Sequence, residues 1–480
     1  MDNEENKEGL TDVNEATKDT EPGVDTPADI AEKKSKITYN EDNIVKIVAG
    51  SGTSSGKEHR HHHHRHHHHH HHHSTTTKKN TKEKLSKRIK KFYRKKRKLK
   101  IAGTVAVFLL IIGLIFGIVD RFTDNRIQRQ LAVKTENNLT IELNDITAPV
   151  QLVNPAVVDY MNSPISVTAK SVFSTYRNKD SRLDYGYPVT INFKIGGYTS
   201  DNPPVGSKIE ISESADYSNP RIINLSGYTR TANVYLLKTG TNYYYRVTTT
   251  FSNEASVTAE STFSTTETPR ILTIDGIANV RDIGGWKTMD GHHIRQGLLY
   301  RGSELDGAVD YTYYVSDYGR ENLLDVLHIK TEMDLRRVEE LPSGGELPLG
   351  KSVRHINYGV FMYAETFHNN NAIKNLFKDL AKEENYPVYL HCTHGLDRTG
   401  TVCYLLEALL GLDEQSIIRE YELSALYFES CSRMDLNAFT TKLRTDYKGQ
   451  TMQDHVRNYL LACGVTQTEI NQIREILLEE

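Results

Sequence analysis

The sequence predicts a multidomain chain: a disordered N-terminal tail, one transmembrane helix, a β-sandwich and then an α/β domain. Three observations predict this order. The first 32 residues carry eleven acids and two lysines with almost no apolar periodicity, which is typical of disorder. Residues 101–119 carry no charge and are mainly apolar. Beyond them, short alternating runs give way near residue 270 to alternating strand and helix patterns.

The tail is expected to span residues 1–77, and its most unusual part is a histidine-rich tract. This tract, His59–His73, is interrupted only by Arg60 and Arg65. Tracts of this kind can bind Zn²⁺ or Ni²⁺, and they also arise as repeat expansions in disordered segments. We expect no defined metal site.

A basic juxtamembrane segment, residues 78–100, precedes the apolar run. It holds fourteen Lys or Arg and one acid, Glu83. The segment alone could bind nucleic acid, but the nineteen residues 101–119 that follow are long enough to cross a membrane. The positive-inside rule then predicts a single-pass signal anchor in the plasma membrane, with residues 1–100 cytoplasmic and 120–480 outside. The basic segment should bind anionic lipid headgroups rather than nucleic acid.

A linker, residues 120–146, should lead to a β-sandwich over residues 147–268. Its clearest strand lies near residue 245, where Tyr243, Tyr245 and Val247 point to one face. Turn signals such as "DNPPVG" separate several such runs. The region shows no cluster of catalytic residue types, so we expect a spacer or a module that binds a surface partner.

The stretch "HCTHGLDRTG", His391–Gly400, carries the chemistry of the last domain. It follows an apolar strand-like run and precedes an apolar helix-like run, so it should form a strand-to-helix turn. Backbone N–H groups at such a turn form an anion-binding nest. Gly395 and Gly400 allow close packing, and Arg398 offers a planar fork for two oxygens of a phosphate. A positive nest lowers the pKa of a thiol, so Cys392 is the expected nucleophile of a phosphatase.

This mechanism also needs a general acid and base, but no metal or cofactor. Two carboxylates are candidates. Asp334 ends a predicted strand and could reach over the loop, whereas Asp397 lies inside the loop and is favoured. Thr399 is expected to donate its hydroxyl to Cys392, and His391 to orient the loop.

Several stretches make residues 270–480 resemble the bacterial tyrosine-phosphatase-like family, whose loop reads His-Cys-x-x-Gly-x-Asp-Arg-Thr-Gly. They are "NVRDIGG" (279–285), "GLLYRGSEL" (297–305), "IKTEMDLRR" (329–337) and the C-terminal helical segments. The resemblance implies an α/β cysteine-phosphatase fold. It implies that the substrate is held by Thr393, His394, Gly395, Leu396, Thr399 and Gly400, with Arg281 and Asp282 in the pocket wall. Separately, Leu237, Gly240, Thr241 and Tyr243 resemble the tyrosine-corner stretch of a fibronectin type III domain.

The loop departs from the family pattern at two positions. Leu396 stands where lysine is common, and His394 stands where alanine is common. A lysine would suit multiply phosphorylated headgroups, so its loss lowers the expectation of phosphoinositide activity. Phosphotyrosine or another phosphoprotein is the expected substrate. A lipid or cell-envelope phosphate ester is the alternative.

Two functions of other classes are alternatives to a phosphatase. One is a surface adhesion protein with an inactive phosphatase-like domain, although Cys392 and Arg398 are both present. Another is a metal or pH sensor that uses the histidine tract. All four cysteines lie in the last ninety residues, which argues against a disulfide scaffold, and the sequence leaves open whether Cys431 or Cys463 forms a disulfide.

Overall fold

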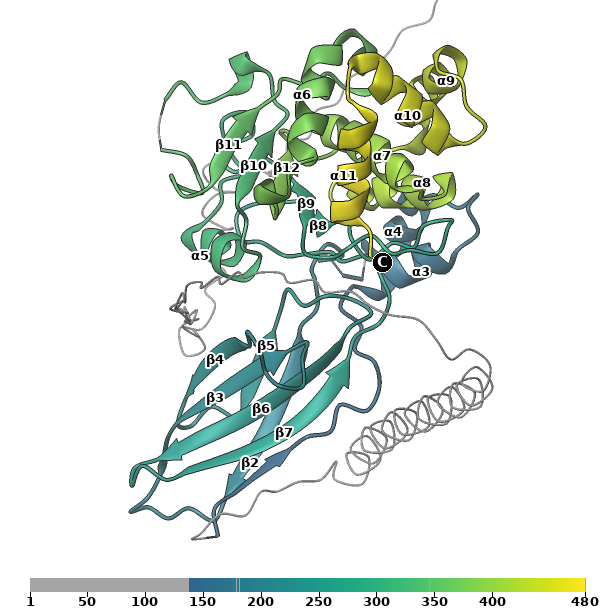
Figure 1. Ribbon diagram of the computed structural model, residues 1–480. Coiled ribbons are helices and arrows are strands. Elements are labelled where there is room, and N and C mark those ends of the chain that lie inside the picture. Colours follow the sequence, from purple (N-terminus) through teal and green to yellow (C-terminus); the bar gives the residue numbers. More distant parts are fainter. Residues whose placement is uncertain (1–137, 178, 181, 345, 480) are drawn as a thin grey trace, which may run out of the picture. The chain divides into compact units, whose positions relative to one another are not determined.

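The computed structural model describes residues 138–479, apart from residues 178, 181 and 345 (Figure 1). The predicted tail, basic segment and signal anchor therefore lie outside the described residues. Within the described part of the chain, no helix is both long and apolar enough to cross a membrane.

Two antiparallel sheets make up most of the first region. The three-stranded sheet has the order β1-β2-β5, with β1 at Thr140–Leu143, β2 at Val189–Gly196 and β5 at Thr231–Val234. The four-stranded sheet has the order β4-β3-β6-β7, with β4 at Arg221–Ser226, β3 at Pro204–Ser212, β6 at Asn242–Phe251 and β7 at Ser256–Ser264. In β6 the side chains of Tyr243, Tyr245 and Val247 are all buried, as their alternation predicts. The hydroxyl of Tyr243 accepts a hydrogen bond from the backbone N–H of Lys238 at 2.8 Å.

The structure of this first region differs from the prediction in two respects. β1 lies within residues 120–146, which were expected to be a linker, and two helices interrupt the predicted sandwich. These are α3 (Pro155–Asn162) and α4 (Ala169–Arg177). Asn154 caps α3 by accepting from the N–H of Ala156, and Pro155 suits the first helical turn. Val153, Ala156, Val157 and Tyr160 follow the helical spacing i, i+3, i+4, i+7, and all four are buried.

The second region contains a mostly parallel five-stranded sheet of order β11-β10-β12-β9-β8 (Figure 1), as predicted. β12 is parallel to β10 and β9, β11 is parallel to β10, and only β8 is antiparallel to its neighbour. The strands are β8 (Arg281–Asp282), β9 (Leu299–Gly302), β10 (Thr331–Asp334), β11 (Arg354–Asn357) and β12 (Val388–His391).

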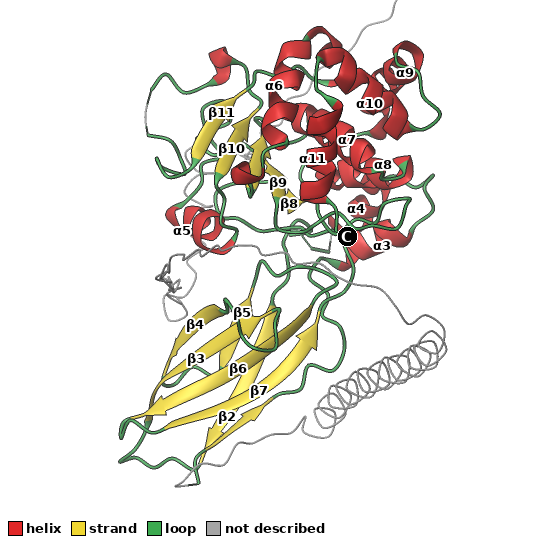
Figure 2. Cartoon of the chain, in the orientation of Figure 1, coloured by secondary structure: helices red, strands yellow, loops and turns green. Residues whose placement is uncertain are grey.

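Helices cover mainly one face of this sheet (Figure 2). Val388 and Leu390 of β12 join the large apolar core on the helical side, whereas Tyr389 joins a smaller core on the other side. The covering helix α7 is buried along nearly its whole length and packs against β12, α10 and α11. The helices are α5 (Asp317–Glu321), α6 (Asn370–Leu380), α7 (Asp397–Leu410), α8 (Glu414–Glu422), α9 (Asn437–Asp446), α10 (Met452–Cys463) and α11 (Gln467–Leu477).

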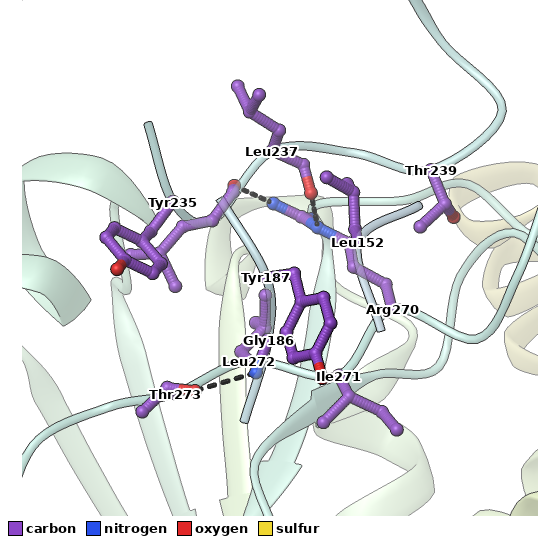
Figure 3. A pocket seen from close by; sticks show the side chains of 11 residues that line it. Leu152, Gly186, Tyr187, Tyr235, Leu237, Thr239, Arg270, Ile271, Leu272 and Thr273 are labelled. Carbon is purple, nitrogen blue, oxygen red and sulfur yellow. Dashed lines mark hydrogen bonds between the residues drawn. The ribbon is translucent and has the colours of Figure 1, made fainter. Parts of the chain in front are cut away.

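Arg270 lies in the chain between β7 and β8, and its side chain lines a small cavity (Figure 3). Its guanidinium donates to the carbonyl oxygens of Leu236 (2.8 Å) and Leu237 (3.0 Å), and to Asp282 Oδ2 (2.6 Å). The cavity beside it measures about 10 Å³. That is room for no more than one water molecule, so this cavity is not a ligand site.

Candidate active site

The stretch His391–Gly400 forms a turn between β12 and α7, as predicted. Two glycines permit its path. Gly395 has φ +67°, and a Cβ there would lie 2.3 Å from the carbonyl oxygen of Gly302. A Cβ on Gly400 would lie 2.8 Å from the ring of Tyr421. Because real Cβ atoms do not approach so closely, only glycine fits either position without a shift of the structure.

Three successive carbonyl groups of the loop are held from outside. The donors are the N–H of Glu304 to Thr393 O (2.9 Å), Asn279 Nδ2 to His394 O (3.1 Å) and Arg301 Nη2 to Gly395 O (2.7 Å). In a planar trans peptide the N–H points opposite to the C=O. The N–H groups of residues 394–396 therefore turn toward the inside of the loop, an arrangement that suits an anion.

Arg398 lies beside Cys392 on this loop, and both are buried. Glu340, in the turn η3 (Val338–Glu340), accepts from Arg398 Nη1 at 2.6 Å and from Nη2 at 3.0 Å. Arg398 Nη2 also donates to Thr393 Oγ1 at 3.1 Å. Burial disfavours the charged guanidinium, but Glu340 and Cys392 outweigh it and raise the pKa of Arg398. The loop thus carries a fixed positive charge at its thiol.

The two candidate acids have different surroundings. Asp397 is half-buried at the first position of α7, and one of its oxygens accepts from the hydroxyl of Tyr363. Asp334 is fully buried, and its carboxylate accepts from Arg336 Nη2 at 2.7 Å and from the N–H of Arg336 at 2.8 Å. Burial alone would raise the pKa of Asp334, but His391, His355 and Arg336 together hold it far below its usual range. The carboxylate of Asp334 is thus committed to a buried ion pair with Arg336, whereas Asp397 lies on the loop itself at the start of α7.

His391 supports the loop from behind and is fully buried. Its Nε2 lies 3.1 Å from Glu332 Oε1, and its Nδ1 lies 3.2 Å from the carbonyl oxygen of Cys392. Burial lowers the pKa of His391, but the charges of Asp334 and Glu332 prevail and raise it to about 9. The ring is therefore an imidazolium at neutral pH, in which both nitrogens donate. The role of His391 in orienting the loop stays a prediction.

The remaining predicted loop residues differ in exposure. His394 lies at the rim: its Nε2 is 3.6 Å from Asp310 Oδ2, and its ring meets Phe428 edge-on at 5.2 Å. Leu396 is buried. The hydroxyl of Thr399 is buried and has no hydrogen-bond partner among the described residues, so the expected bond to Cys392 is not formed in this structure.

Arg281 and Asp282 occupy different surroundings from those implied by the resemblance. Arg281 is buried and donates to Glu420 Oε1 at 2.5 Å. Asp282 is buried too, and it pairs with Arg270 and accepts from the N–H of Gly297 at 2.6 Å. Among the described residues, neither forms a hydrogen bond or an ion pair with the loop, which differs from the expected place in a pocket wall. They support the layer beneath it.

Sequence reasoning missed four supporting residues: Arg301, Glu340, Tyr363 and Glu420. Arg301 is fully buried and connects Gly395 O to Glu420 Oε2, at 2.7 Å and 2.6 Å. The sequence did contain a hint of this role, because Arg301 directly follows the apolar strand run "LLY" in the stretch "GLLYRGSEL". A charge so placed has to be paired inside the protein. Glu340 and Tyr363 carried no such signal.

A cysteine and an arginine share one strand-to-helix loop at the carboxyl end of a central parallel strand, which is the arrangement expected of a cysteine-type phosphatase. Residues 272–479 match the family described as "Tyrosine phosphatase family". A protein of Nostoc commune named "Tyrosine-protein phosphatase" is 37% identical over 62 residues, which is 13% of this chain and 21% of that protein. The chain therefore spans about a fifth of the length of this curated relative.

Two solved structures are also similar. One is the core catalytic domain of the PP-IP phosphatase Siw14 from S. cerevisiae, at 17% identity and a TM-score of 0.22, covering 30% of this chain and 80% of that chain. The other is a Siw14 catalytic core at 17% identity and a TM-score of 0.23, covering 32% of this chain and 85% of that chain. The family match and the named relative, with the loop, identify residues 272–479 as a phosphatase domain.

Among the described residues, no three His, Cys, Asp or Glu side chains gather in a way that could hold a metal ion. The histidine tract His59–His73 lies outside the described residues. The four cysteines are free and buried. Cys392, Arg398 and Asp397, together with the groups that hold them, form the candidate site.

Proposed function

We propose that this domain hydrolyses phosphate monoesters of phosphoproteins, phosphotyrosine first among them, through a cysteinyl-phosphate intermediate. The observation that carries the proposal is the pairing of Cys392 with Arg398 inside a nest of N–H groups. Glu340 accepts two hydrogen bonds from Arg398 and Thr393 accepts a third, which leaves two of the five N–H donors of the guanidinium for the oxygens of a phosphate.

The first step transfers the phosphoryl group to the enzyme. The thiolate of Cys392 attacks phosphorus, and the S–P bond forms as the P–O bond to the leaving group breaks. Arg398 and the loop N–H groups bind the three equatorial oxygens, whose charge they stabilise. Asp397 gives its proton to the departing oxygen.

The second step restores the enzyme. Asp397, now a carboxylate, takes a proton from a water molecule whose oxygen attacks phosphorus, and the S–P bond breaks to release inorganic phosphate and the thiolate. The hydroxyl of Tyr363 binds only one oxygen of Asp397. The other oxygen is left to carry the proton in both steps.

The rim of the loop supports an aromatic substrate. His394, Tyr313 and Phe428 group there, with ring centroids 5.8 Å apart for Tyr313 and His394 and 5.2 Å apart for His394 and Phe428. Aromatic rings favour edge-to-face packing with an aryl group. Arg398 supplies one cationic group for the phosphate, which suits a monoester, and Leu396 adds no second charge.

We further propose that the enzyme is a single-pass membrane protein with its catalytic domain outside the cytoplasm. Support comes from the basic run before residues 101–119. Between the membrane and the catalytic domain we propose a fibronectin type III-like module. The grouping of three and four strands supports this, as does the bond from Lys238 N–H to the Tyr243 hydroxyl, which has the pattern of a tyrosine corner. Protease added to intact cells should then remove the catalytic domain and spare the tail, with lysed cells as the control.

The test of the activity is an assay of the full-length protein on a phosphotyrosine peptide, a phosphoserine peptide and a lipid phosphate. We expect the phosphotyrosine peptide to give the highest kcat/KM, and Cys392→Ser to abolish turnover while it still binds inorganic phosphate. Arg398→Ala should lose both properties. Turnover by Cys392→Ser at the wild-type rate would falsify the mechanism, and a preference for the lipid phosphate would replace the proposed substrate class.

A further inference from the structure

The helices α3 and α4 form a hairpin that precedes β2 in the chain but packs into the core of the phosphatase domain. Val157, Tyr160 and Phe173 are fully buried. They belong to the same apolar core as Tyr421 of α8 and Leu426 of the turn η6 (Leu423–Leu426). The phosphatase family match begins only at residue 272. The hairpin therefore completes the core from outside the matched region.

Polar contacts fix the hairpin to one segment, residues 419–433. The hydroxyl of Tyr160 donates to Glu422 Oε2 at 2.6 Å, and Arg419 Nη1 donates to the carbonyl oxygen of Tyr160 at 2.6 Å. Further donors are Arg433 to the carbonyl oxygens of Ile165 (2.5 Å) and Val167 (2.9 Å), and Arg177 to the carbonyl oxygen of Ala425 (2.5 Å). Because Glu422 is buried, its carboxylate depends on these partners, which are Tyr160 and Arg433.

The other side of the same segment supports the catalytic loop. Glu420 accepts from Arg301 at 2.6 Å, and Arg301 holds the carbonyl group of Gly395. The ring of Tyr421 lies against Gly400. Its hydroxyl is 2.6 Å from that of Tyr363, which donates to Asp397.

The two sets of contacts alternate with the period of a helix. Residues 419, 422 and 425 contact the hairpin, whereas residues 420, 421 and 424 contact the groups beneath and beside the catalytic loop. A shift of α8 by a fraction of an ångström would therefore move Glu420, which supports Gly395 through Arg301, and Tyr421, whose hydroxyl contacts that of Tyr363. Small displacements of this kind have large effects on rate.

We infer that the α3–α4 hairpin is a positioning element of the phosphatase, acting through α8 on the loop His391–Gly400 and on Asp397. The inference rests on the proposed function and deepens it. Tyr160 is a positioning residue, since it touches neither the loop nor Asp397. The catalytic unit accordingly includes residues 155–177 and does not begin at residue 270.

The experiment compares Tyr160→Phe with Tyr176→Phe in the full-length protein. Tyr176 lies on the same hairpin, and its hydroxyl contacts only Asp159 within the hairpin. Both variants thus lose a tyrosine hydroxyl, but only Tyr160→Phe loses the hydrogen bond to Glu422. We measure kcat/KM for nitrophenyl phosphate and phenyl phosphate at 25 °C, together with the thermal unfolding midpoint.

Tyr160→Phe should lower kcat/KM for phenyl phosphate by about tenfold and for nitrophenyl phosphate by less, because the poorer leaving group depends more on Asp397. Tyr176→Phe should stay within about twofold of wild type. A lower unfolding midpoint with unchanged kcat/KM in Tyr160→Phe would show a purely structural hairpin and overturn the inference. Equal losses in the two variants would overturn it as well.

Two further measurements distinguish a failure of the proposed function from a failure of the inferred role of the hairpin. Arg419→Lys removes the planar fork that binds Tyr160 O and Ser163 O but keeps the charge. If Tyr160→Phe does not fold, kcat/KM for the two phosphates and the unfolding midpoint are measured for Arg419→Lys instead, with the same expected outcomes. Inorganic phosphate binding is compared between Cys392→Ser and Cys392→Ser with Tyr160→Phe. A wild-type protein without turnover refutes the proposed function. Unchanged phosphate affinity together with unchanged turnover in Tyr160→Phe refutes only the role of the hairpin.

Discussion

Glu340 grips Arg398 through both oxygens of its carboxylate, at 2.6 Å and 3.0 Å, across 58 residues of sequence. The same carboxylate accepts from the N–H of Arg337 at 2.8 Å, so it is itself held in place. The guanidinium that should bind phosphate is thus oriented before any substrate arrives. Preorganised charge of this kind needs no rearrangement during the reaction.

Glu340→Ala should therefore lower kcat/KM for an aryl phosphate by about tenfold, because Arg398 loses its fixed orientation. Glu339→Ala is the matched control. It removes the neighbouring carboxylate, which is 65% exposed and pairs only with Arg337 among the described residues. Steady-state kinetics of the two variants decide the matter, and a rise in kcat/KM for Glu340→Ala would mean that the glutamate blocks the site instead.

Asp397→Asn and Asp334→Asn should differ in their dependence on the leaving group. Loss of a general acid slows an alkyl or phenyl phosphate by roughly 10²–10⁴-fold and hardly slows a nitrophenyl phosphate. Asp397→Asn should show this selective loss. Asp334→Asn should reduce both substrates evenly and lower the unfolding midpoint, since it leaves Arg336 and His391 with one fewer counter-charge in a buried cluster. Selective loss in Asp334→Asn alone would assign the acid to Asp334.

His391 predicts a dependence of stability on pH. Its pKa rises from the ordinary 6.5 to about 9 in the folded protein. A group whose pKa is raised by folding contributes its full stabilisation at pH values below its unfolded pKa. This stabilisation is lost as the pH rises through the folded pKa of about 9. The free energy of unfolding should fall by about 3 kcal/mol over that window on this account. Urea unfolding from pH 6 to 10 measures it, and His391→Gln should remove most of the slope. An equal slope in His391→Gln would assign the titration to another group.

Gly395→Ala should be far more damaging than Gly291→Ala. Both glycines have positive φ, +67° and +93°, but nothing lies within 4 Å of a Cβ on Gly291. Gly291→Ala should therefore cost only the left-handed strain of about 1–2 kcal/mol. In Gly395→Ala the new Cβ meets the backbone of Gly302, so the nest has to open. Phosphate affinity and the unfolding midpoint, measured together, test this, and similar results for the two variants would contradict it.

The catalytic loop could be predicted because its signals are local. The apolar run before Cys392 predicts the strand, and the one after Gly400 predicts the helix. The residues between them are of the types that a cysteine-type phosphatase needs. Arg281 and Asp282 were expected in the pocket wall but pair with Glu420 and Arg270 instead. A sequence motif gives the residue types but not the direction in which each side chain points. Arg301 and Glu340 were missed because their partners are distant in sequence. The helical spacing from Val153 to Tyr160 was present, but it lies beside strand-like runs and was assigned to the sheets.

The bond from Tyr160 to Glu422 closes a loop of 262 residues. A ribosome adds roughly 5–20 residues per second. The α3–α4 hairpin therefore leaves the ribosome roughly 13 to 52 s before Glu422 is made, which is the separation of 262 residues divided by that rate. During that time the apolar side of the hairpin, with Tyr160 and Phe173, has no core to enter. The newborn chain thus carries an exposed apolar surface until α8 and the turn η6, the elements that pack against α4, have been made.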